Sequence, residues 1–134
     1  MSRENVELVL RVLDQARHNN ATAFLEVLDD EARWEVGSLD IPDSGGTWHG
    51  PAGVREFFRR WVGPFDEWSY DFGGVIDAGD SVVVRIHQWG RGKGSGAIVE
   101  SRFWQVLTIR DGKIVRVTHH AEKDEALKAL GLEE

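Results

Sequence analysis

The sequence predicts an α+β fold in which a curved, mostly antiparallel sheet wraps around three N-terminal helices, with a short helix closing the chain. Three observations support this. Apolar residues recur at helical spacing in the first half, they alternate with polar residues in the second half, and turn-forming glycines divide the second half into strands. A sheet curved around helices encloses an apolar hollow. We expect that hollow to hold one small molecule, with its few polar residues deciding the chemistry.

The composition limits the number of domains and the partners. With 134 residues, the chain forms one domain over residues 1–134, large enough to bury about two-thirds of its unfolded surface. The net charge of −7 disfavours nucleic acid and anionic membranes as partners. Cysteine is absent, which excludes disulfides, thiolate nucleophiles and cysteine metal sites. Six tryptophans predict large rings that fill a core, line a cavity or anchor an interface.

The N-terminal residues and the hydropathy favour a soluble cytoplasmic protein. Charged residues run through the N-terminus, which lacks the apolar stretch of a signal peptide. No apolar run approaches the roughly 20 residues that a membrane-spanning helix needs.

Two helices are predicted before residue 30. The first has an apolar stripe made of Val6, Val9, Leu10, Leu13 and Ala16. Its other face is charged, as expected of a half-buried helix. His18, Asn19 and Asn20 interrupt it, and a short second helix then carries Phe24, Leu25 and Leu28.

A short strand and an irregular loop precede the third helix. The strand spans residues 32–36 with Trp34 at its centre, and the loop spans residues 37–46. We leave open whether this loop is a lid over the hollow. The third helix begins at Gly50-Pro51, because proline is tolerated at the first helical position, and ends at Gly63-Pro64. Its apolar stripe consists of Val54, Phe57, Phe58 and Trp61.

The second half is predicted as four strands. Trp68, Tyr70 and Phe72 alternate with polar residues in the first of them, and Gly73-Gly74 indicates a bulge. Turns follow at residues 78–80, 90–96 and 111–112. The strands between and after these turns span residues 82–91, 97–110 and 113–120, and a helix at residues 123–130 closes the chain.

The register of the last hairpin decides which of its two histidines faces inward. A two-residue turn at Asp111-Gly112 sets Leu107 opposite Arg116, whereas a three-residue turn that includes Arg110 sets Leu107 opposite Val115. We prefer the second register, because it gathers the aliphatic residues on one face and leaves the arginines outside. The inward face then consists of Phe103, Gln105, Leu107, Ile109, Val115, Val117 and His119.

The opposite, convex face carries aromatic residues. Alternation places Trp104 and His120 there, and His87 and Trp89 join them if Ile86 faces inward. An exposed aromatic cluster is unusual on a monomer. We therefore expect a homodimer that pairs through this face, the alternative being scattered surface aromatics.

Several features of the chain together match a known superfamily. They are the element order, Trp34, the helix start at His49-Gly50-Pro51, and the turn segments at residues 75–80 and 110–115. The chain resembles the SnoaL-like proteins of the ketosteroid isomerase and nuclear transport factor 2 superfamily. The resemblance implies a cone-shaped α+β barrel whose pocket lies between the concave sheet face and the helices. Enzymes of this fold include isomerases, polyketide cyclases, dehydratases and epoxide hydrolases, while other members only bind or assemble.

The resemblance also argues against the mechanism of ketosteroid isomerase. The position of its substrate-contacting tyrosine corresponds to Val12, and that of its general-base aspartate corresponds to Val36. The protonated aspartate of its oxyanion hole corresponds to Gln105, which can still donate a hydrogen bond. Polyketide cyclases and many relatives place a carboxylate on the last strand, where this chain has His119. A histidine there can act as a general base near neutral pH.

The candidate catalytic residues are therefore His119, as acid or base, and Gln105, as the donor that polarises a carbonyl or orients a hydroxyl. Both could instead merely satisfy buried hydrogen bonds. The expected contacts of a small apolar ligand are Trp34, Val36, Phe57, Trp61, Phe103 and Val12. We expect no cofactor. We also expect no metal, because His119 and His120 point to opposite faces of one strand and cannot bind one ion together.

Three hypotheses follow for the function. The first is a cofactor-independent isomerase, cyclase, dehydratase or hydrolase acting on a compact apolar substrate. The second is a non-catalytic carrier or sensor that uses the same pocket. The third is an interaction domain whose cavity is filled by its own side chains and whose main property is dimerisation. A collapsed cavity would exclude the first two.

Overall fold

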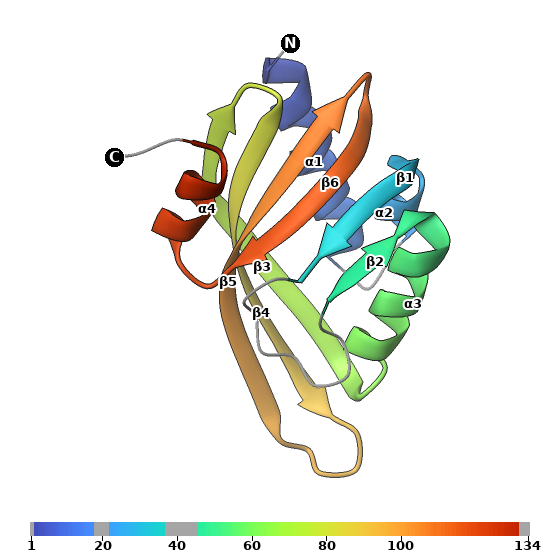
Figure 1. Cartoon of the computed structure of the whole chain (residues 1–134). Helices are drawn as coiled ribbons and strands as arrows, with labels where there is room; N and C mark the ends of the chain where they lie inside the picture. Colours follow the sequence, from blue (N-terminus) through green and yellow to red (C-terminus); the bar gives the residue numbers. More distant parts are fainter. Residues whose placement is uncertain (1, 18–21, 37–45, 132–134) are drawn as a thin grey trace.

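The computed structural model describes residues 2–17, 22–36 and 46–131. Its elements, in order, are α1 (Ser2–Ala16), α2 (Thr22–Leu25), β1 (Leu28–Glu35), β2 (Thr47–His49), α3 (Gly50–Val62), β3 (Phe65–Ala78), β4 (Ser81–Gly92), β5 (Ile98–Arg110), β6 (Lys113–His120) and α4 (Lys123–Ala129). The predicted α+β class is confirmed (Figure 1). The loop predicted at residues 37–46 lies outside the described residues except for Gly46.

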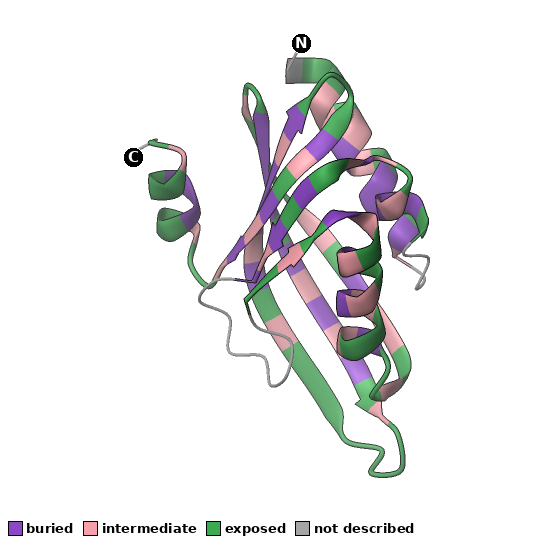
Figure 2. Cartoon of the chain, turned by 45° about the vertical axis from the view of Figure 1, so that its right-hand side comes forward, coloured by how far each residue is buried: buried purple, intermediate pink, exposed green. Residues whose placement is uncertain are grey.

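The six strands form one curved sheet in the order β2-β1-β6-β5-β4-β3. Neighbouring strands are antiparallel except β1 and β6, which run parallel. The helices α1, α2 and α3 lie on the concave side, and α4 lies on the convex side (Figures 1 and 2). Within the described part of the chain, no helix combines the length and the apolar character needed to cross a membrane.

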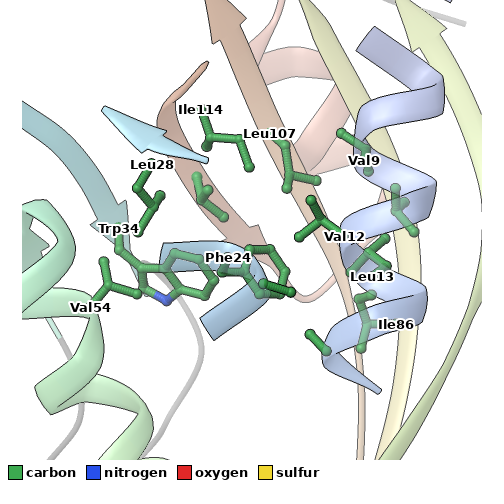
Figure 3. Close-up of a cluster of buried hydrophobic side chains, with 14 of the residues drawn as sticks. Val9, Val12, Leu13, Phe24, Leu28, Trp34, Val54, Ile86, Leu107 and Ile114 are labelled. Carbon is green, nitrogen blue, oxygen red and sulfur yellow. The ribbon is translucent and has the colours of Figure 1, made fainter. Parts of the chain in front are cut away.

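The main hydrophobic core lies between the concave sheet face and the first three helices (Figure 3). Val9 and Leu13 of α1 are fully buried in this core. Leu107 of β5 and Trp34 of β1 are buried in it as well. Complete burial of such a side chain contributes about 1.5–3 kcal/mol. A second, smaller core under α4 consists of Val83, Val106 and Ala126, with Ile76, Trp104 and Leu130 packed against it.

Two predictions between residues 22 and 49 were wrong in their bounds. The second helix ends at Leu25, and Leu28 is the first residue of β1, which begins four residues before the predicted strand at 32–36. The reason is a tertiary contact: Leu28 pairs with Ile114 of β6, and both side chains become buried. The strand β2 was not predicted, because three residues are too few for alternation to be recognised.

The last hairpin has neither of the two predicted registers along its whole length. Asp111 and Gly112 form a two-residue turn, both with positive φ, and Ile109 pairs with Ile114. The three-residue turn was therefore wrong. Val115 is an extra residue, after which the register shifts and Leu107 pairs with Val117.

This bulge has a physical cause and a consequence for the site. Ile114 and Val117 are both buried although three positions separate them, which a regular strand does not allow. The bulge restores the facing that was predicted for the rest of the strand, so His119 pairs with Gln105 and both are buried. Ile114 replaces Val115 on the inward face.

The turn of the hairpin formed by β4 and β5 is shorter than predicted. The bulge expected at Gly73-Gly74 is confirmed by a register shift between Gly73 and Ile76. The strands β4 and β5 continue to Gly92 and from Ile98, so the turn predicted at residues 90–96 is displaced toward the tip. Gly90 lies within β4, where a Cβ atom would be only 2.7 Å from the Phe65 ring, so this position requires glycine.

Candidate functional site

A small cavity lies between the concave face and the first three helices. Its lining residues come from α1, α2, α3 and from β1, β3, β4 and β5, with His119 from β6. The space that can accept the centre of a water molecule is about 40 Å³, enough for roughly three waters. The cavity is therefore small, but it has not collapsed. None of the described residues that line it is an Asp, Glu, Lys or Arg.

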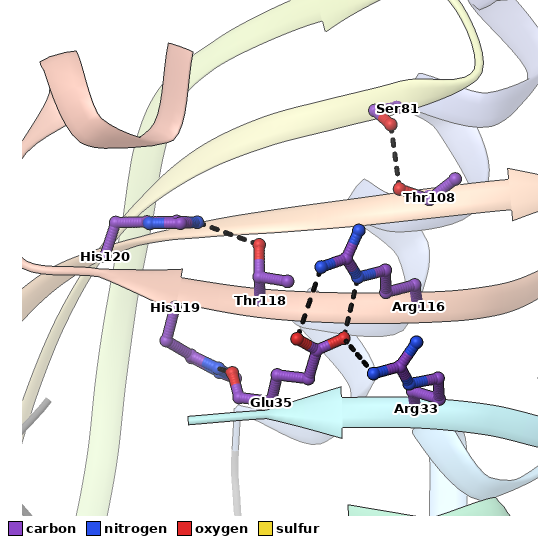
Figure 4. Close-up of polar contacts among 8 residues, drawn as sticks. All are labelled: Arg33, Glu35, Ser81, Thr108, Arg116, Thr118, His119 and His120. Atoms are coloured by element: carbon purple, nitrogen blue, oxygen red, sulfur yellow. Dashed lines mark hydrogen bonds and ion pairs between the residues drawn. The ribbon is translucent and has the colours of Figure 1, made fainter. Parts of the chain in front are cut away.

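The polar side of this cavity is the pair Gln105 and His119. Their side chains project from the adjacent strands β5 and β6, and both are at least 95% buried. The Nε2 atoms of the two side chains are 3.1 Å apart. The imidazole Nδ1 lies 2.9 Å from the backbone carbonyl oxygen of Glu35 on β1 (Figure 4). One imidazole therefore joins three strands.

The carbonyl of Glu35 determines where the proton of His119 resides. A carbonyl oxygen only accepts, so Nδ1 of His119 is protonated and donates to it. In the neutral ring, Nε2 then carries a lone pair and accepts from the amide nitrogen of Gln105. The Oε1 atom of Gln105 is left buried without a hydrogen-bond partner.

His119 is uncharged at neutral pH. Complete burial lowers the pKa of His119 from 6.5 to about 4, although the hydrogen bond to Glu35 partly opposes this. The ring also packs between Trp34 and Phe103, with ring centroids 5.2 and 5.5 Å away. Such surroundings keep the basic form of the imidazole but make its protonated form costly.

The cavity wall contains most of the predicted ligand contacts. Trp34, Val36, Phe57, Trp61 and Phe103 all line it. Val12 is fully buried in the core, but the neighbouring Leu13 lines the cavity in its place. The wall rings pack closely: the Trp34 and Phe57 centroids are 5.7 Å apart, with the two rings tilted by 44°.

Other wall residues were not predicted as ligand contacts. They are Phe24, Phe58, Trp68, Tyr70, Ile86 and Gln88. Strand alternation carried the signal for four of them, because Trp68 and Tyr70 share one face of β3, and Ile86 and Gln88 share one face of β4. Gln88 accepts a hydrogen bond of 3.2 Å from Nε1 of Trp61. The hydroxyl of Tyr70 donates to the backbone of Leu13.

The convex side of the same strands is polar. Arg116 donates to both carboxylate oxygens of Glu35, at 2.7 and 3.2 Å (Figure 4). This contact lowers the pKa of the Glu35 carboxyl. His120 lies there half-buried, 2.9 Å from the Thr118 hydroxyl, and burial lowers its pKa. Among residues 2–17, 22–36 and 46–131, no group of three or more His, Cys, Asp or Glu side chains is arranged to hold a metal ion.

The predicted interface residues do lie on this convex side. His87, Trp89, Trp104 and His120 are all partly exposed, and the rings of His87 and Trp89 are 5.3 Å apart. α4 covers part of the face, since Ala126 packs on Val83 and Val106. Its placement was not predicted.

Comparisons with known proteins agree with this architecture. The sequence profile of the SnoaL-like domain matches residues 9–117. No curated protein matches the chain significantly. The fold resembles that of TerC, which was co-crystallised with polyporic acid; the two share 22% sequence identity over 95% of this chain and 98% of TerC, with a TM-score of 0.75.

Two further structures show the same fold. An NTF2-like protein of unknown function from Burkholderia pseudomallei is 21% identical, over 94% of this chain and 96% of that protein, with a TM-score of 0.74. A candidate SnoaL-like polyketide cyclase from Jannaschia sp. CCS1 is 20% identical, over 98% and 94%, with a TM-score of 0.73. At these identities the likeness concerns the fold, which is the cone-shaped one expected from the sequence.

Proposed function

We propose that this chain, which belongs to the SnoaL-like domain family, is a pocket protein that binds one compact, mostly apolar molecule between its concave sheet face and its first three helices. The observation that carries the proposal is a buried polar pair, Gln105 and His119, at the wall of an otherwise aromatic cavity. A concave apolar site with a few convergent polar groups is the usual form of a small-molecule site.

The size of the cavity favours a compact ligand. A space of about 40 Å³ admits only a few waters, so a ring-sized ligand requires wall side chains to move. Phe58, Trp61 and Trp68 are partly exposed and pack at the edge of the core. These three side chains have the most freedom to move outward.

A pair of matched variants tests the proposal. Ile86 lines the cavity, whereas Ile76 packs on the convex side. In a fluorescence titration with uncharged single-ring aromatic compounds, we expect Ile86→Phe to lose binding and Ile76→Phe to keep it. Circular dichroism verifies that both variants fold, because overpacking costs about 1–3 kcal/mol. Equal binding by both variants would exclude the cavity as the site.

The second candidate function is acid–base catalysis in the same pocket, as an isomerase, cyclase, dehydratase or hydrolase. The position of His119 supports it, because Nε2 of the neutral imidazole offers a lone pair at the cavity wall, although a pKa of about 4 makes that nitrogen a weak base. A substrate would have to replace the amide of Gln105 at Nε2 of His119. In that case His119→Ala abolishes turnover while ligand binding persists, and turnover that survives the substitution excludes His119 as the base.

We also propose that the chain forms a homodimer through the convex face. Four partly exposed side chains on that face support this: His87, Trp89, Trp104 and His120. Trp89 is the most informative to change, because Trp104 also packs in the small core under α4 and its substitution would disturb that core. Sedimentation velocity should show a dimer for the wild type and a monomer for Trp89→Glu. A wild-type monomer at high concentration would exclude the dimer.

A further inference from the structure

We infer that the ligand is an uncharged molecule with a hydroxyl or N–H group, and that this group donates a hydrogen bond to Oε1 of Gln105. This inference rests on the proposed function and specifies the class of ligand. It begins from the hydrogen bonds around His119, which determine how the amide of Gln105 is oriented.

The orientation of the amide follows from a chain of three contacts. Glu35 supplies a backbone carbonyl, which requires a proton on Nδ1 of His119. The lone pair on Nε2 then requires a donor, and that donor is the amide nitrogen of Gln105 at 3.1 Å. The opposite amide orientation would bring two acceptors together. The amide oxygen is therefore the group left for another molecule.

That oxygen is buried and has no hydrogen-bond partner. A buried acceptor without a donor is costly, and a donor supplied by a ligand removes the cost. The indole Nε1 atoms of Trp34 and Trp68, two other wall residues, are also buried without partners. Gln88 differs, because its oxygen already accepts from Trp61. The wall thus has an unused acceptor and unused donors, which a hydroxyl-bearing molecule can match.

The charge of the wall excludes ionised ligands. No Asp, Glu, Lys or Arg is found among the described lining residues. Burial also keeps the imidazole of His119 neutral, since it lowers its pKa to about 4. A carboxylate or an ammonium group would enter this cavity without a counter-charge, which is far more costly than burying a neutral hydroxyl.

Single-ring probes separate these alternatives. Phenol has a donor, methoxybenzene has the same ring without a donor, and benzoate is an anion. The affinity of each is measured by fluorescence titration or calorimetry on the wild type, on Gln105→Met and on Gln15→Met. The quantity compared is the dissociation constant of methoxybenzene divided by that of phenol. A substitution that changes the hydrophobicity of the pocket affects both constants, so this effect cancels in the ratio. Gln15→Met is the matched control, since Gln15 is exposed on α1 and does not line the cavity.

We expect the ratio to fall about tenfold in Gln105→Met and to stay unchanged in Gln15→Met, with no measurable binding of benzoate to the wild type. An unchanged ratio in Gln105→Met, or benzoate that binds as tightly as phenol, overturns the inference while leaving the pocket intact. If Gln105→Met does not fold, the wild-type comparison of phenol with benzoate decides alone. If no probe binds to the wild type, the proposed function itself fails.

Discussion

His119 and His120 are neighbours in the chain, yet they occupy opposite environments. His119 is buried between Trp34 and Phe103 on the concave side, and its proton is assigned by a backbone carbonyl. His120 is half-buried on the convex side, beside a hydroxyl. The strand period of two places them on different faces. The difference shows that residue type alone does not make a site, because only His119 lines the apolar cavity on the concave side.

The same contrast holds for the faces of the sheet. The concave face packs on three helices and contains the aromatic cavity wall. The convex face carries the ion pair of Glu35 and Arg116 and a small core under α4. Stability and ligand chemistry should therefore depend on the concave face much more than on the convex one. Three predictions test that difference.

The largest effect is expected from the tryptophans of the two faces. Trp34 is 2% exposed and contacts Phe24, Phe57 and Phe58. The substitution Trp34→Ala should lower the free energy of unfolding by about 3–5 kcal/mol. Trp104 is partly buried, and Trp104→Ala should cost about 1 kcal/mol. Urea denaturation measures both values. A larger loss for Trp104→Ala than for Trp34→Ala would contradict the greater dependence of stability on the concave face.

The second prediction concerns the pH dependence of stability. The pKa of His119 is lowered to about 4 in the folded protein and is 6.5 when unfolded. The unfolded state therefore takes up the proton first as the pH falls. Stability should be complete above pH 6.5 and should fall by up to about 3 kcal/mol between pH 6.5 and pH 4.

Asparagine variants separate the two histidines. His119→Asn keeps a donor near the Glu35 carbonyl but does not titrate, so the loss between pH 6.5 and pH 4 should largely disappear. His120→Asn should retain most of it. The charged groups that face His120 are Glu125, Arg116 and Glu35. Because the pKa of the Glu35 carboxyl is lowered, its protonation reduces the stability only at lower pH. An unchanged pH profile in His119→Asn would contradict a neutral, buried imidazole.

The smallest effect is expected from the convex ion pair. Glu35 contacts Arg116 and Arg33, but both arginine side chains are more than half exposed. Because solvent screens such pairs, Glu35→Gln should lower the free energy of unfolding by less than about 1 kcal/mol, and less still at high salt. The measurement is urea denaturation at two salt concentrations. A loss above 2 kcal/mol that does not depend on salt would show that the convex pair supports the fold as strongly as the concave face does.

Periodicity alone predicted the elements that form the cavity. Alternation placed Gln105 and His119 on one face, and the helical stripe placed Phe57 and Trp61 against it. The bulge at Val115 was not predictable, because it results from two buried residues that lie three apart. The residues at the end of β6 still face the side that was predicted, because the observed register differs from the predicted one by an even number of residues.

Contacts between distant segments account for what the sequence did not reveal. The partner of Nδ1 in His119 is a backbone carbonyl of β1, and a carbonyl has no residue identity to recognise. The placement of α4 on the convex side depends on Ala126 packing against Val83 and Val106. Gln88 was recognisable in principle, because it shares a face with Ile86, but its role became visible only through Trp61.

The six tryptophans provide the most direct test of where a ligand binds. Three of them, Trp34, Trp61 and Trp68, line the cavity, whereas Trp48, Trp89 and Trp104 are not among its lining residues. In a titration with phenol followed by ¹H–¹⁵N NMR, the indole signals of the first three should shift, and those of Trp89 and Trp104 should stay in place. Shifts confined to Trp89 and Trp104 would place binding on the convex face and contradict a functional site in the concave cavity.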